Sequence, residues 1–128
     1  MEIERSGEVY ADFVVPHLHQ GARLVDVGCG SGALTLGLAS LVGRVIGVDA
    51  DSEAAIAAQH SAKSRGIRNA DFVAGDALSL PLASASADVV FGHSVLEAVT
   101  RPGQAITEMV RTLRAGGVLA VATSSTTD

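Results

Sequence analysis

The stretch Val25-Asp-Val-Gly-Cys-Gly-Ser-Gly32 decides the fold, because a short apolar run ends there in three closely spaced glycines. This pattern is typical of a buried strand that turns sharply into a helix. Glycines permit the tight turn and let a ligand approach the backbone, and the helix that follows offers free N–H groups at its positive end. The turn alone is a weak signal, since Gly28, Gly30 and Ala33 also fit a dinucleotide-binding fingerprint, with Asp49 at about the right distance for a ribose.

Further valine-rich runs follow this turn, and segments with helical patterns separate them. The runs are nearly continuous in apolar residues rather than alternating, as expected for strands covered on both faces. The predicted strands are 23–27, 44–49, 71–74, 87–91 and 117–122. The predicted helices cover 33–42, Asp51 or Ser52 to about Arg65, and Pro102 onward, with a final turn at Gly116-Gly117. This repetition predicts an α/β fold with a parallel sheet and right-handed crossovers.

The composition is that of one compact globular domain over residues 1–128, with 48% hydrophobic and 18% charged side chains. The net charge of −5 argues against a nucleic-acid partner, which would need clustered lysines and arginines, and against an anionic membrane surface. A single cysteine excludes an intramolecular disulfide and favours a reducing compartment, so a cytoplasmic location is expected. No stretch reaches the roughly 18 apolar residues of a membrane span, and the start lacks a signal-peptide core.

The two ends of the chain are expected to differ from the repeating part. Residues 1–20 are predicted to form a helical segment that packs through apolar side chains and ends at Pro16. Within it, Tyr10 is expected either to close over a bound ligand or to join the core. Residues 124–128 are predicted to form a polar tail.

Three carboxylates lie at the carboxyl ends of predicted strands. Asp26 lies in an apolar strand end, where a buried charge is costly unless a partner such as a ligand ammonium group is supplied. Asp49 ends the second strand, where a carboxylate would accept both hydroxyls of a ribose. Asp76 follows the third strand and would accept from the exocyclic amine of an adenine. Parallel strands bind ligands at their carboxyl ends, so the three are expected to face one crevice. The alternative for Asp49 and Asp76 is an ordinary strand-end or capping role.

Five motifs occur together in a characteristic order. They are Asp26-x-Gly28-x-Gly30-x-Gly32, Gly47-Val-Asp49, Gly75-Asp76-Ala77, Asp88-Val-Val-Phe91 and Leu113-Arg-Ala-Gly-Gly117. With them, the sequence resembles class I S-adenosylmethionine-dependent methyltransferases from about residue 10 to 122, especially those that modify small molecules and lipid-like metabolites. The resemblance implies a doubly wound, Rossmann-like three-layer sandwich with five parallel strands in the order 3-2-1-4-5. It also implies methyl transfer to a small molecule, without a metal.

The resemblance further implies a role for each motif residue. The methionine part of the cofactor would be held by Asp26, Gly28, Cys29, Gly30 and Gly32. Asp49 would bind the ribose and Ala50 would pack near the adenine. Asp76 and Ala77 would contact the edge of the adenine. The sulfonium and the substrate would be bordered by His93 and Ser94.

The catalytic role is the most open of these assignments. His93 is the only plausible general base by position, and a packing or hydrogen-bonding role is as well supported by the sequence. Cys29 has no basic neighbour in the sequence to activate it, so we expect a small buried filler rather than a nucleophile. His17, His19 and His60 show no metal-ligand spacing.

The sequence departs from the family pattern at two places. Ala115 stands where the family usually has a proline before the Gly-Gly turn, which implies a minor loss of rigidity. The sequence stops at Asp128, whereas family domains continue with further helices and an antiparallel strand pair. Residues 118–122 would then form an apolar edge strand, and such edges invite pairing. A homodimer is therefore expected.

Two further functions are compatible with the residues. A non-catalytic S-adenosylmethionine-binding module is favoured by the short C-terminus. A nicotinamide-dependent oxidoreductase is favoured by the glycine spacing with Ala33, and disfavoured by Asp26 and Asp76.

Overall fold

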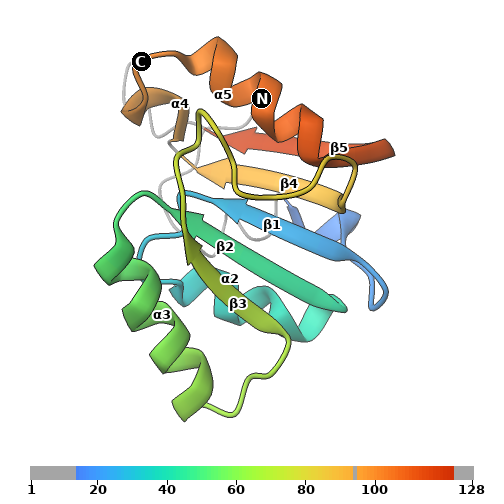
Figure 1. Cartoon of the computed structure of the whole chain (residues 1–128). Coiled ribbons are helices and arrows are strands. Elements are labelled where there is room, and N and C mark those ends of the chain that lie inside the picture. The colour runs from blue at the N-terminus through green and yellow to red at the C-terminus, as the bar shows by residue number, and fades with distance from the viewer. Residues whose placement is uncertain (1–13, 94, 123–128) are drawn as a thin grey trace, which may run out of the picture.

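The computed structural model describes residues 14–93 and 95–122. Its centre is one parallel sheet of five strands in the order β3-β2-β1-β4-β5 (Figure 1). The strands are β1 (Arg23–Val27), β2 (Arg44–Asp49), β3 (Ala70–Ala74), β4 (Ala87–His93) and β5 (Leu113–Ala122). The predicted α/β class, the parallel sheet and the strand order are confirmed. β1 is the central strand of the sheet. The glycine turn that follows it therefore lies midway along the row of strand carboxyl ends.

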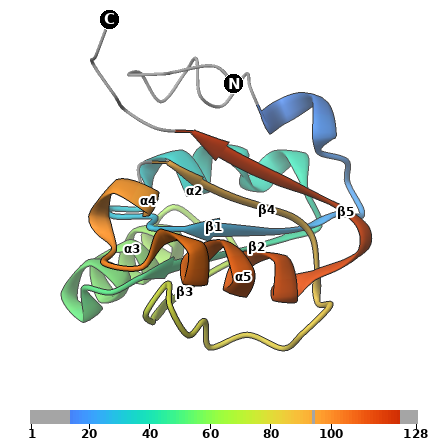
Figure 2. The same ribbon diagram turned by 90° about the horizontal axis from the view of Figure 1, so that it is seen from above.

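Short helices cover both faces of this sheet. They are η1 (Val15–His17), α2 (Ala33–Leu38), η2 (Ala39–Leu41), α3 (Ser52–Ser64), α4 (Val95–Ala98) and α5 (Pro102–Thr112). Figure 2 shows α2 and α5 on opposite faces of the sheet. No helix in the described ranges is long and apolar enough to cross a membrane.

The core consists of two clusters, one on each face of the sheet. The first cluster contains the buried side chains of α2 and α3 with Leu24, Phe72 and Phe91 of the strands. The second cluster contains Met109 of α5 and Val95 of α4 with alternate strand residues. Successive side chains of a strand point to opposite faces, so a continuous apolar run supplies both clusters.

The start of α3 illustrates how the sequence determines a boundary. The Asp51 side chain accepts hydrogen bonds from the N–H groups of Glu53 at 2.9 Å and Ala54 at 3.4 Å. Asp51 is therefore the N-cap, and Ser52 is the first residue of the helix. Gly66 follows the helix with a φ of 71°, a conformation that glycine adopts without strain.

The first crossover helix is shorter than its apolar stripe predicts. The α-helix ends at Leu38 and continues as the 3₁₀ turn η2. Asn69 explains the change, because its side-chain amide donates to the carbonyls of Ala39 at 2.7 Å and Val42 at 3.2 Å. These bonds satisfy carbonyls at the helix end, so the chain can turn early toward β2.

One other boundary also differs from expectation, at the last strand. Pro16 lies in the first turn of η1, where its fixed φ fits and its missing N–H is not needed, while the helix expected before it falls mostly in residues 1–13, outside the described residues, and stays a prediction. The last strand begins at Leu113 rather than residue 117, because Leu113 already pairs with Ala87. The predicted glycine turn lies inside β5, where the pairing with β4 shifts register and Gly116 has a φ of 81°.

Candidate nucleoside-binding site

A cavity of about 290 Å³ opens at the carboxyl ends of the central strands. Its walls are strand-end residues, the start of the loop after β3, and one side of α4. The lining residues are Val27, Gly28, Val48, Asp49, Ala50, Gly75, Asp76, Ala77, Val95, Ala98 and Val99. An apolar pocket with a few convergent polar groups is the usual form of a small-molecule site, and its volume lies near the lower end of their range of about 300 to 1,000 Å³.

The glycine turn is hydrogen-bonded to the end of β2. The N–H groups of Gly28 and Cys29 both donate to the carbonyl of Val48, at 2.7 Å and 3.1 Å. The N–H of Gly30 donates to Oδ2 of Asp49 at 2.8 Å. Gly28, Gly30 and Gly32 all have positive φ values, so the turn needs residues without a Cβ. These contacts set the distance between the turn and the carboxylate at the end of the next strand.

Asp49 links three segments around the pocket. Besides the Gly30 contact, its Oδ1 accepts from the N–H of Asp51 at 2.9 Å. A carboxylate oxygen accepts more than one hydrogen bond, so each oxygen retains acceptor capacity toward the cavity that Asp49 lines. Two acceptors on one rigid carboxylate match a pair of neighbouring hydroxyl groups on a sugar.

Asp76 and Ala77 line the cavity from the turn that follows the neighbouring strand, β3. Oδ1 of Asp76 accepts from the N–H of Leu78 at 2.9 Å, and the Asp76 carbonyl accepts from the N–H of Ser79 at 2.9 Å. These two bonds make a tight turn directly after β3. The N–H of Gly75 donates to the carbonyl of Asp49 at 2.9 Å, so this turn is also joined to β2.

Asp26 lies beneath the glycine turn and does not line the cavity. Its side chain is 5% exposed and accepts a hydrogen bond from the Thr35 hydroxyl at 2.5 Å. Burial raises the pKa of Asp26 to about 7; the Thr35 bond lowers the pKa in part, and the charge of Asp49 raises it further. The expectation that three carboxylates face one crevice is therefore met for Asp49 and Asp76 only. In the structure, α2 supplies the polar partner that the sequence assigned to a ligand.

Replacing Asp26 by asparagine is expected to stabilise the protein at alkaline pH. The folded pKa is about 7, against 3.8 for the ordinary group, so the folded state holds the proton more tightly than the unfolded state. The contribution of Asp26 to stability is thus most favourable below pH 4, falls as the pH rises to about 7, and is constant above. At 1.36 kcal/mol per pKa unit, about 4 kcal/mol is lost across this window.

Urea unfolding of the wild type and Asp26→Asn at pH 4, 6 and 8 measures this effect. Asparagine remains neutral and still accepts the Thr35 bond, so the variant should gain little at pH 4 and most at pH 8. A difference between the two proteins that does not change with pH would contradict the pKa argument.

Cys29 has the properties of a packed thiol. It lies against Gly47 and the first core cluster, and burial raises the pKa of its thiol to about 12, with further increases from the charges of Asp26 and Asp49. A thiol with this pKa is protonated at neutral pH and is a poor nucleophile. The expected filler role agrees with this environment.

The predicted catalytic end of the site is described in part. His93 is the last residue of β4, and its backbone pairs with Ala122 of β5. Ser94 and Tyr10 lie outside the described residues. Within 14–93 and 95–122, no group of three or more His, Cys, Asp or Glu side chains is arranged to hold a metal ion.

Sequence reasoning missed the α4 side of the pocket. Val95, Ala98 and Val99 line the same cavity as Asp49, and Cβ and Cγ2 of Val95 lie 3.8 Å from the position that a Cβ on Gly28 would take. A signal was present, since positions 95, 98 and 99 follow the i, i+3, i+4 spacing of one helical face.

The comparisons with known proteins agree with this fold and site. Residues 25–121 match the family model described as a methyltransferase domain. An uncharacterized methyltransferase of Schizosaccharomyces pombe is 31% identical over 88% of this chain and 44% of its own length. A ubiquinone biosynthesis O-methyltransferase of Sinorhizobium fredii is 36% identical over 88% of this chain and 45% of its own length. The crystal structure of the cyclase SpnF is 30% identical with a TM-score of 0.83, covering 93% of this chain and 48% of that chain.

The chain belongs to the methyltransferase-domain family. The resemblance to class I S-adenosylmethionine-dependent methyltransferases is thereby confirmed, and S-adenosylmethionine is the cofactor of this class. The family assignment decides against the nicotinamide-dependent alternative. The chain spans less than half the length of the two curated relatives described above.

Proposed function

We propose that this chain binds S-adenosylmethionine in the described cavity and transfers its methyl group to a small-molecule acceptor. Asp49 would accept from the two ribose hydroxyls, and Asp76 with Ala77 would contact the edge of the adenine. Ala50 and the apolar wall of α4 would pack against the nucleoside. The glycine turn, with Asp26 beneath it, would hold the methionine part.

One observation carries the proposal: Asp49 and Asp76, from the ends of the neighbouring strands β2 and β3, both line one cavity whose remaining lining is mostly apolar. A nucleoside presents sugar hydroxyls at one end and a flat base with an exocyclic amine at the other. Two separate carboxylate acceptors beside apolar surface in one cavity match this arrangement. The residues present therefore fit the adenosine part of the cofactor.

The chemistry requires little from the protein beyond position. When bound, S-adenosylmethionine supplies a methyl group that its sulfonium already activates. The residues of this chain would hold the nucleoside rigidly and exclude water from the apolar wall, so that an acceptor approaches the methyl group in line. A base is needed only for an acceptor that must lose a proton, and His93 at the end of β4 is the residue proposed for it.

Binding of S-adenosylhomocysteine, the expected product, tests the proposal. Isothermal titration of the full chain should give micromolar affinity, with NAD as the negative control. A folded protein that does not bind S-adenosylhomocysteine, or prefers NAD, would overturn the proposal.

A module that binds S-adenosylmethionine without transferring its methyl group is the second candidate. The observation that favours it is the similarity to SpnF, a cyclase, because a protein with this fold can thus have a function other than methyl transfer. Incubation with S-adenosylmethionine and a panel of small O-, N-, C- and S-acceptors separates the candidates. Binding without product from any acceptor would support the module, whereas a methylated product would establish the enzyme.

We also propose a cytoplasmic homodimer. Among the described residues, β5 ends the sheet order and has a hydrogen-bonded strand on one side only, toward β4. Pairing of the free edge of residues 118–122 with a second copy would satisfy its backbone groups. Light scattering at high concentration should give twice the mass of the chain, and a clean monomer would contradict the dimer.

A further inference from the structure

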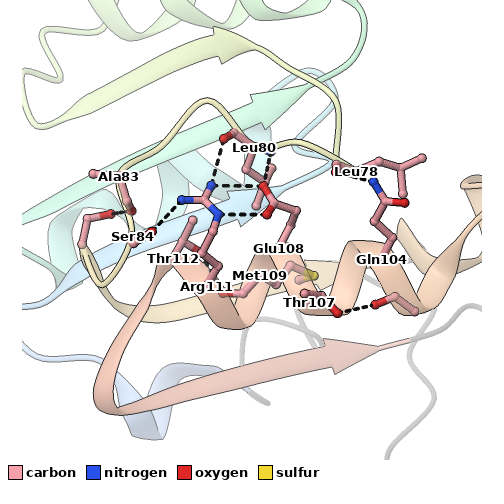
Figure 3. Close-up of polar contacts among 12 residues, drawn as sticks. Leu78, Leu80, Ala83, Ser84, Gln104, Thr107, Glu108, Met109, Arg111 and Thr112 are labelled. Carbon is pink, nitrogen blue, oxygen red and sulfur yellow. Dashed lines mark hydrogen bonds and ion pairs between the residues drawn. The ribbon is translucent and has the colours of Figure 1, made fainter.

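Helix α5 presents a row of polar side chains to the loop that carries Asp76 and Ala77. Gln104, Glu108 and Arg111 recur at helical spacing, and Figure 3 shows all three pointing toward residues 78–84. The buried residues of the helix, among them Met109, form part of the second core cluster instead. The helix therefore has one apolar face for the core and one polar face for the loop.

The contacts reach the loop backbone at successive points. The Gln104 amide donates to the carbonyl of Leu78 at 2.9 Å. The N–H of Leu80 donates to Oε1 of Glu108 at 2.8 Å, and Nη2 of Arg111 donates to the Leu80 carbonyl at 3.0 Å. Both backbone groups of Leu80 are thus held by one pair of side chains (Figure 3).

Glu108 and Arg111 form a preorganised unit. Nε and Nη2 of Arg111 donate to the two carboxylate oxygens of Glu108 at 2.8 Å and 3.1 Å. The Glu108 side chain is only 17% exposed, and the hydrogen bond from Arg111 lowers the pKa of this carboxyl. Nη1 of Arg111 also donates to the Ser84 hydroxyl at 3.0 Å, which extends the unit along the loop.

These contacts lie close to the proposed nucleoside-binding groups: Leu78, held by Gln104, is two residues from Asp76, and Leu80 is four residues from it. The N–H of Leu78 donates to the Asp76 carboxylate, while its carbonyl is the acceptor for Gln104. Leu80 is 5% exposed and packs in the same cluster as Val48, which lines the cavity. Fixing Leu78 and Leu80 therefore fixes the turn that aims Asp76.

We propose that Gln104, Glu108 and Arg111 are positioning residues that keep Asp76 and Ala77 in the nucleoside-binding conformation without touching the ligand. This inference rests on the proposed function. When the binding-competent conformation is only partly populated, the apparent dissociation constant rises by the reciprocal of its population. Loss of an anchor would weaken binding by allowing the turn to leave that conformation.

Gln104→Leu tests the proposal most directly, because it removes one anchor from an exposed position and keeps the helix and the ion pair. The dissociation constant for S-adenosylhomocysteine should rise by about tenfold, as for the loss of one well-placed hydrogen bond. The matched control is Val110→Thr, an isosteric change on the same helix at a side chain that is 52% exposed. It should leave the dissociation constant unchanged.

A double-variant cycle distinguishes positioning from a general loss of structure. In an Asp76→Ala background, Gln104→Leu should raise the dissociation constant for S-adenosylhomocysteine less than about twofold, because the group through which Gln104 acts has been removed. Glu108→Gln should show the same dependence, with its Leu80 contact kept and its charge toward Arg111 lost. If Gln104→Leu raised the dissociation constant equally in both backgrounds, or did not raise it in the wild type, the inference would be overturned and the proposed function would stand. A wild type that does not bind S-adenosylhomocysteine would overturn both.

Discussion

Asp49→Ala is expected to raise the dissociation constant for S-adenosylhomocysteine by about a hundredfold or more. The substitution removes both acceptors assigned to the ribose, and hydrogen bonds to a charged group contribute about 1.5 to 3 kcal/mol each. It also releases the N–H groups of Gly30 and Asp51, which Asp49 accepts in the structure. Isothermal titration of the wild type and the variant measures the change.

Two further variants give this result its meaning. Asp49→Asn keeps the shape and one acceptor oxygen, so it should retain more affinity than alanine and less than the wild type. Glu53→Gln changes a nearby carboxylate in the first turn of α3 that does not line the cavity, and should bind as the wild type does. Equal losses for Glu53→Gln and Asp49→Ala would indicate a general effect of charge rather than contact with a ribose.

Gly32→Ala is expected to lower the free energy of unfolding by about 3 kcal/mol. The residue has a φ of 81°, which costs other residues about 1 to 2 kcal/mol. An added Cβ would lie 2.8 Å from Cε1 of Phe72 and 2.9 Å from Cβ of Ala58, and overpacking of this kind costs about 1 to 3 kcal/mol. Urea unfolding measures the loss.

Two other glycines separate the backbone strain at Gly32 from the overpacking against Phe72. Gly30→Ala meets no atom within 4 Å but has a φ of 56°, so only the backbone cost of about 1 kcal/mol is expected. Gly103→Ala, in α5, also meets nothing within 4 Å and should stabilise the protein by about 0.5 to 1 kcal/mol. If Gly30→Ala proved as damaging as Gly32→Ala, the contact with Phe72 would not be the cause.

Most of the fold follows from local patterns in the sequence. Continuous apolar runs identified the five strands, and Asp51 and Gly66 marked the two ends of α3. The strand order came from the family resemblance, since it depends on how distant segments meet. The early end of α2 depends on Asn69, which lies far along the chain from the helix that it caps.

The site was predictable where its residues follow strand ends. The carboxyl ends of parallel strands lie side by side, so Asp49 and Asp76 were expected to face one crevice, and both line the cavity. The partner of Asp26 was not predictable, because the reach of Thr35 depends on the rotation of α2 over the sheet. The anchors on α5 were missed because they bind backbone atoms of Leu78 and Leu80, which leave no signature in the side-chain sequence.

The division of the core between two faces of the sheet has a consequence for local opening. The apolar residues of the cavity, such as Val27, Val48 and Val95, belong to the cluster beneath α4 and α5. A ligand stabilises only the states that contain its site, by RT ln(1 + [L]/Kd). Bound cofactor would therefore slow hydrogen exchange of the amides that are exposed only when that face opens. The amides exposed by fraying of α3, on the other face, would exchange at their ligand-free rate.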